Sequence, residues 1–339
     1  EGLLRRGYQV TILHRGTHEV DFSGPVEHLH GDPHFEETLK ETLGARSFDL
    51  VVSMYGRLRH VAQELRGRTK QFIAVGGLPY RAFVEGDRDP EGVPVPVPET
   101  APLFQDEERN RFTYLMALSE QVVMEAHEQG HYRATIMRFP LVYGPRQLAP
   151  PEWGIIRRIL DGRKQLIIPD GGLRLERRGY AENAAQAILL AVEQPQRAAG
   201  QIYNVADETI LSLRDWIETI ARTLDHQWEL ASLPFWLARP TRPYAGRAHH
   251  RVLDIAKIRT ELGYRDAVPT REAIRRTVHW YLENRPEPGG EVERQLGDPF
   301  DYATEDAIIQ DYQEAAARIR DKASVGYRWR HAYDHPERG

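Results

Sequence analysis

Short apolar runs rich in β-branched residues alternate with helical segments through the first 140 residues of the chain. Residues 8–13, 48–53 and 71–75 have the composition of strands, and the amphipathic segments between them have helical periodicity. Parallel strands joined by helices are buried on both faces, which explains runs that are largely apolar. The pattern predicts an α/β protein with a doubly wound parallel sheet of at least five strands.

The chain changes character near its middle. Five prolines between positions 90 and 102 exclude a helix or a central strand there, so residues 86–102 are expected to form a surface loop. After Pro150-Pro151 the apolar spacing changes, which indicates a second, smaller domain. We expect a first domain of residues 1–148 with about 180–195, a second of 149–179 and 196–285, and a linker with a helical tail over 286–339.

Composition excludes several classes of site. With no cysteine, the chain has no disulfide, no thiolate nucleophile and no cysteine-ligated metal. Its formal charge of −5 is spread along the chain, so nucleic-acid binding is not expected. No run approaches the roughly 20 apolar residues of a membrane span. These features predict a soluble cytoplasmic protein.

Separate sequence motifs follow one another in an order typical of one protein family. They are RFPLVYGPR at 138–146, RGYAEN at 178–183, YNV at 203–205, and DIAK at 254–257 ahead of ELGY at 261–264. In this order they resemble the extended short-chain dehydrogenase/reductases, specifically the NAD-dependent epimerase/dehydratase group. The resemblance covers roughly residues 1–284. It implies a Rossmann-type dinucleotide-binding domain and a smaller α/β C-terminal substrate domain, with the site between them.

The chain departs from that family pattern at three places. The family's first strand and glycine-rich pyrophosphate loop, roughly 20 residues, are expected to be missing through N-terminal truncation. The family's tyrosine and lysine, one helical turn apart, fall at Phe112 and Met116, and its serine or threonine falls at Gly77. The resemblance therefore implies a lost catalytic triad. Replacement acids by chain position are Tyr143, Tyr80 and Tyr114, each also open to a purely packing role.

The resemblance implies that a nicotinamide dinucleotide lies across the ends of the strands. An arginine at position 15 suits the 2′-phosphate of NADP, so NADP is expected and NAD is possible. A solvated turn arginine and a helix-capping Asp32 are the structural alternatives. The expected cofactor contacts are His14, Arg15, Asp32, Ser53, Gly56, Gly76, Gly77, Pro140, Leu141, Val142 and Tyr143.

Arginines near the implied cleft suit a phosphate or carboxylate of the substrate, although ordinary surface arginines are the alternative. The expected substrate contacts are Arg146, Arg178, Tyr180, His250 and Arg251.

Three further segments carry expectations. His28, His30 and His34 lie close in sequence, but without a fourth ligand they predict no metal site. Arg157-Arg158 is expected on a solvated helix face. The helix expected at residues 302–322 is predicted to pack over the cleft or against a partner in a homodimer.

The combined expectation is an atypical ketoreductase that acts on a small-molecule carbonyl or alcohol with NAD(P). The alternative is a non-catalytic dinucleotide-binding sensor with a degenerate site.

Overall fold

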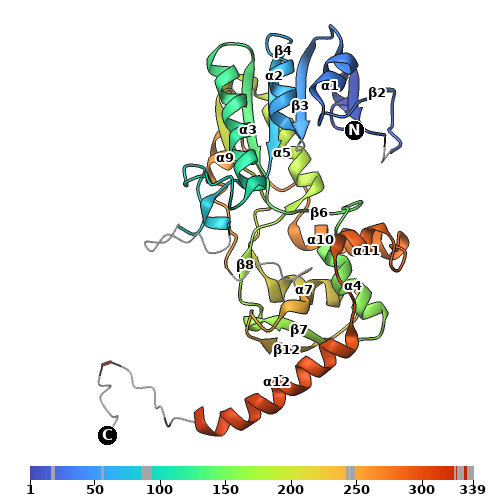
Figure 1. Ribbon diagram of the computed structural model, residues 1–339, viewed down its shortest axis with the longest axis vertical. Coiled ribbons are helices and arrows are strands. Elements are labelled where there is room, and N and C mark those ends of the chain that lie inside the picture. Colours follow the sequence, from blue (N-terminus) through green and yellow to red (C-terminus); the bar gives the residue numbers. More distant parts are fainter. Residues whose placement is uncertain are drawn as a thin grey trace, which may run out of the picture.

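The computed structural model describes residues 1–16, 20–54, 57–84, 94–241, 244, 249–323, 326 and 332–333. Figure 1 shows an upper part built around β3 and β4 and a lower part built around β7, β12 and the helices that pack on them. Within the described ranges, no helix is both long and apolar enough to cross a membrane.

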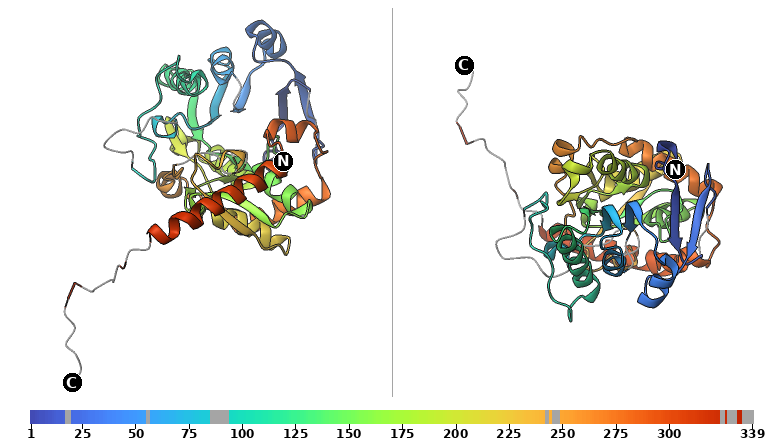
Figure 2. Two further views of the ribbon diagram at one scale, coloured as in Figure 1. Left: turned by 60° about the horizontal axis from the view of Figure 1, so that its bottom comes forward. Right: turned by 90° about the horizontal axis from the view of Figure 1, so that it is seen from above.

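The strands of the upper part form two parallel sheets. β1 (Val10–His14) pairs with β2 (Val26–His30), and the four-stranded sheet has the order β10-β5-β4-β3. Figure 2 shows the first pair beside the larger sheet. The predicted single sheet is thus corrected, because no strand of the described residues bonds to both β1 and β3. The four strands are β3 (Phe48–Met54), β4 (Thr69–Gly76), β5 (Arg133–Arg138) and β10 (Gln201–Asn204).

Helices cover both faces of the four-stranded sheet, as the apolar runs predict. Phe72 and Ala74 of β4 pack in one core cluster, and Ile73 and Val75 pack in another. Alternate residues of a strand point to opposite faces, so one strand contributes to both cores. The first core includes α1 (Glu36–Leu43), α2 (Leu58–Glu64) and α3 (Arg111–Glu128), and the second includes α5 (Ala181–Glu193) and α9 (Ala256–Glu261).

The lower part has its own apolar core. Trp153, Ile156, Trp216 and Ile274 are buried there together. They come from α4 (Pro151–Leu160), α7 (Leu213–Thr223) and α10 (Thr270–Glu283). The strand pairs are β7 (Gln165–Pro169) with β12 (Glu229–Leu233), β8 (Leu175–Glu176) with β11 (Leu211–Ser212), and β6 (Val142–Tyr143) with β9 (Gly179–Tyr180). The predicted domain boundaries stay a prediction.

The segment after residue 286 packs on the lower part through its first helix and the first half of its second. It forms α11 (Glu291–Leu296) and α12 (Tyr302–Ala323), and Ile309 of α12 is buried beside β7 and β12. Arg158, expected on a solvated face, is fully buried because Asp298 and Glu305 from this segment pair with it. Contact of α12 with a second copy stays a prediction. Short helices also lie at Leu4–Arg6, Arg81–Phe83, Asp170–Gly172, Pro195–Ala198 and Arg239–Thr241.

The start of α3 is set by a side-chain cap. α3 begins at Arg111, because the Asn110 side chain accepts a hydrogen bond from the Thr113 amide at 3.0 Å. We expect Asn110→Ala to lower the free energy of unfolding by about 1 kcal/mol in urea denaturation. Asn110→Asp keeps the acceptor and serves as control. An unchanged stability of the alanine variant would contradict the role of this cap.

Candidate functional site

The carboxyl ends of β3 and β4 form the part of the sheet where the cofactor is expected. Ser53 lies near the end of β3 with 8% of its surface exposed. Gly76 ends β4, and a Cβ added there would meet no described atom within 4 Å. The backbone at Gly76 is therefore open to a ligand, and Gly77 follows it directly. Gly56 lies outside the described residues.

The segment after β5 supplies the next expected cofactor contacts. Leu141 after Pro140 is 39% exposed, and Val142 and Tyr143 form β6. The Tyr143 hydroxyl is buried and donates to Asp207 Oδ2 at 2.8 Å. Burial and the neighbouring Asp207 carboxylate raise the pKa of Tyr143. Its proton is thus held within the protein, which makes Tyr143 a poor general acid.

The three positions at which the sequence resemblance places the family's triad, a prediction that stays open, carry no proton donor in their side chains. Phe112 lies in the first turn of α3 with 73% of its surface exposed, and Met116 lies one turn later, partly buried. Gly77 has no side chain. An exposed phenyl ring at the first of these positions offers an apolar surface and no acid.

Tyr80 and Tyr114 occupy different environments. The Tyr80 hydroxyl donates to Asn204 Oδ1 at 2.6 Å and accepts from Arg138 at 2.7 Å. Burial raises the pKa of Tyr80 to about 12. Tyr114 instead lines a pocket of about 270 Å³ on α3, with Leu118 and neighbouring side chains. The catalytic role of either tyrosine stays a prediction.

A buried ion pair, which the sequence analysis did not anticipate, joins α3 to β5. Arg138 donates to both carboxylate oxygens of Glu120, at 2.9 and 2.7 Å. Burial raises the pKa of Glu120, although the bonds from Arg138 oppose that effect. The pair fixes α3 against the sheet, and so fixes the position of Phe112. The signal in the sequence for this ion pair was Glu120, an acidic residue on the side of α3 that faces the sheet.

The residues expected at the adenosine end lie at the end of β1 and just after β1 and β2. Asp32 accepts hydrogen bonds from the His34 amide at 2.9 Å and from His34 Nδ1 at 2.6 Å, which lower the pKa of Asp32. Arg15 is exposed and contributes weakly to the same effect. His14 lies 3.0 Å from His28, measured between Nε2 and Nδ1.

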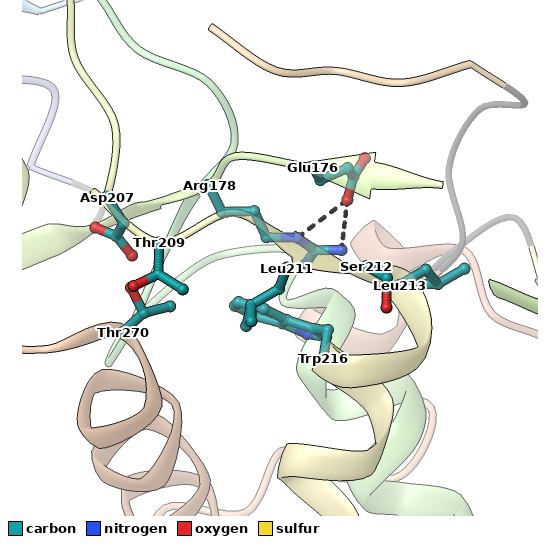
Figure 3. Close-up of a pocket in the computed structure, with 9 residues that line it drawn as sticks. All are labelled: Glu176, Arg178, Asp207, Thr209, Leu211, Ser212, Leu213, Trp216 and Thr270. Carbon is teal, nitrogen blue, oxygen red and sulfur yellow. Dashed lines mark hydrogen bonds and ion pairs between the residues drawn. The ribbon is translucent and has the colours of Figure 1, made fainter. Parts of the chain in front are cut away.

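Arg178 lies in a buried charged cluster around β8. Its guanidinium donates to Glu176 at 2.9 and 3.1 Å and stacks over Trp216 at 4.2 Å (Figure 3). Burial would raise the pKa of Glu176, but Arg178 and Arg174 outweigh it, and the pKa is lowered. The adjoining cavity of about 10 Å³ has room for about one water molecule. Arg178 is therefore already paired with Glu176, and an anionic group of a substrate would have to compete with Glu176 for it.

The other expected substrate contacts divide between two regions. Arg251 joins the cluster through a backbone β-bridge to Glu176, and its guanidinium stacks over the Phe83 ring at 5.4 Å. His250 Nδ1 accepts from the Leu175 amide at 2.9 Å. The structure thus brings Arg178, His250 and Arg251 together around β8. Tyr180 is buried, with a pKa raised to about 12 by burial and the Glu182 carboxylate, and Arg146 lies on an exposed turn.

Known proteins share parts of this sequence. Residues 90–206 match the family model described as NAD dependent epimerase/dehydratase family. Uncharacterized protein y4nL of Sinorhizobium fredii is 31% identical over 172 residues, which are 44% of this chain and 47% of that protein. dTDP-glucose 4,6-dehydratase of Streptomyces niveus is 26% identical over 229 residues, 66% of this chain and 60% of the relative. The matched part thus spans roughly half of these relatives.

Solved structures share the fold. dTDP-glucose 4,6-dehydratase of Bacillus anthracis, in complex with NAD, has a TM-score of 0.63 at 13% identity, covering 83% of this chain and 90% of that one. UDP-glucose 4-epimerase of Thermotoga maritima, with UDP-glucose, has a TM-score of 0.64 at 17% identity, covering 84% and 94%. The Rossmann-like α/β fold predicted from the sequence is confirmed.

Proposed function

We propose that this chain, which belongs to the NAD-dependent epimerase/dehydratase family, is an oxidoreductase with an atypical active site that uses a nicotinamide dinucleotide. Its substrate is a small-molecule carbonyl or alcohol. The match over residues 90–206 carries the proposal, because that segment contains β5, which pairs with β4 up to Gly76, and α3, which carries Phe112 and Met116. The names of the relatives make sugar nucleotides the first substrates to test.

A dinucleotide fits the described strand ends. The open backbone at Gly76 lets a flat ring approach. Ser53 lies on the neighbouring strand β3, and Leu141 follows the neighbouring strand β5. A bound nicotinamide would supply or accept a hydride. The solved relative from Bacillus anthracis contains NAD, and the relatives give the predicted NADP preference no support. That preference rests on Arg15 alone.

The proposed chemistry proceeds without the family's phenol acid. Phe112 and Met116 supply no proton, so water or a hydroxyl of the substrate protonates the oxygen. Loss of a general acid lowers the reaction rate about 10²- to 10⁴-fold, whereas correct positioning of cofactor and substrate still accelerates the reaction. We expect slow turnover. The same replacements support the second candidate, a dinucleotide-binding protein without catalysis.

Paired fluorescence titrations with NADPH and NADH test the proposal. We expect Arg15→Ala to weaken NADPH binding about tenfold or more, because a charge-assisted contact to the 2′-phosphate is lost, and to leave NADH binding unchanged. Arg46→Ala, which removes an exposed arginine paired with Glu27, is the matched control.

Absence of binding to either dinucleotide would refute both candidate functions. Binding with turnover of a panel of carbonyl compounds and sugar nucleotides would identify the enzyme. Binding without turnover would identify the binding protein.

A further inference from the structure

Three histidines lie on one face of the β1–β2 pair. His14 is directly opposite His30, and Ile12 is opposite His28. Residues opposite each other on paired strands share a face, as do residues two apart on one strand. His14, His28 and His30 therefore point to the same side, near the carboxyl ends of both strands.

The imidazole nitrogens converge. His14 Nε2 lies 3.0 Å from His28 Nδ1, and one nitrogen from each of the three rings lies within 4.8 Å of the others. The ring centroids of His14 and His30 are 4.8 Å apart. Tetrahedral zinc with Zn–N bonds of about 2.1 Å separates its nitrogen ligands by about 3.4 Å. The His14 and His28 nitrogens lie within about 0.4 Å of that spacing, and the one ligand nitrogen of His30 lies no more than 4.8 Å from either.

We propose that His14, His28 and His30 bind one divalent transition-metal ion of the Zn²⁺ class. Neutral imidazole suits Zn²⁺, Ni²⁺ and Cu²⁺, whereas Mg²⁺ and Ca²⁺ prefer oxygen. Because His28 and His30 are exposed and His14 is half-buried, an ion reaches the site from solvent. Three protein ligands leave one position for water or an external ligand. The site adds an ion-binding activity that the proposed function does not require.

The turn after β1 responds to occupancy of this site. The Gly16 amide donates to His14 Nδ1 at 3.1 Å, so in the free protein the His14 proton lies on Nε2 and faces His28. A metal ion on Nε2 takes the place of that proton, which moves to Nδ1. The Gly16 amide then loses its acceptor. Metal binding is thereby linked to the conformation of the turn that carries Arg15.

His34 provides a matched control. It lies in the same part of the chain and is similarly exposed, but its Nδ1 is bound to Asp32 at 2.6 Å. His34→Ala removes an accessible imidazole without touching the cluster.

Calorimetric titration of the tag-free full chain with ZnCl₂ tests the proposal, and Co²⁺ absorption gives an independent readout of the ligand set. We expect one ion per chain for the wild type and for His34→Ala. His28→Ala and His30→Ala should each weaken binding at least about tenfold, and the double variant should abolish it. Both replaced side chains are exposed, and circular dichroism verifies the fold of each variant.

Two results would overturn the site. One is a wild-type chain that takes up no stoichiometric Zn²⁺. The other is a correctly folded His28→Ala/His30→Ala variant that binds as the wild type does, which would assign the binding to other histidines among the 14 in the chain.

Discussion

The double variant Phe112→Tyr/Met116→Lys is expected to turn over a carbonyl substrate about 10² to 10⁴-fold faster than the wild type. The two positions lie one turn apart on α3, so a lysine at 116 stands beside a phenol at 112. The ammonium group lowers the pKa of the phenol and makes it a better acid. Phe112 is 73% exposed, so the added hydroxyl costs no burial of a polar group.

Single variants separate the acid from the charge. Met116→Lys alone adds an ammonium group one helical turn away from position 112 but no phenol there, and should give little of the gain. Phe112→Tyr alone adds a phenol without the nearby ammonium and should give a smaller gain than the pair. Steady-state oxidation of NADH or NADPH measures all three against the wild type. If the double variant binds dinucleotide but its rate stays at the wild-type level, the missing acid does not explain slow turnover.

The sequence predicts the local elements of this protein well. The apolar periodicity that ends before Gln194 predicts a helix over residues 181–193, and α5 spans Ala181–Glu193. The apolar run from Phe72 to Val75 predicts a buried strand, and β4 contains it. Both signals depend on neighbours in the chain, which decide periodicity and propensity.

Contacts between distant segments were harder to predict. The parallel register of β1 and β2 places His14 opposite His30 and so forms the histidine cluster. Nearness in the sequence instead grouped His34 with His28 and His30 and left out His14. The sequence left a catalytic role open for the Tyr143 hydroxyl, whereas in the structure this hydroxyl donates a hydrogen bond to Asp207, 64 positions away. Periodicity shows which face of a helix or strand is buried, but not which other element packs against that face. Candidate site residues were therefore easier to predict than the residues they contact.

Replacement of Arg158 by methionine is expected to lower the free energy of unfolding by about 3 to 5 kcal/mol. The Arg158 side chain has no exposed surface and donates to Asp298 at 2.7 and 3.0 Å and to Glu305. Methionine fills much of the same volume but leaves two buried carboxylates without a counter-ion. The Arg158 pairs also attach the segment after residue 290 to α4, so this attachment is weakened, although Arg157 and Trp153 still bind Glu293.

Urea denaturation of the full chain measures this loss, and Arg163→Met is the matched control. Arg163 pairs with Asp306, which lies on α12 as Glu305 does, but the Asp306 side chain is 53% exposed. Loss of this pair is therefore expected to lower the free energy of unfolding by only about 0 to 1 kcal/mol. Adding Asp298→Asn to Arg158→Met removes one unpaired charge and should recover part of the stability. Equal losses in the two arginine variants would contradict the argument, because burial of the partner carboxylate is what separates them.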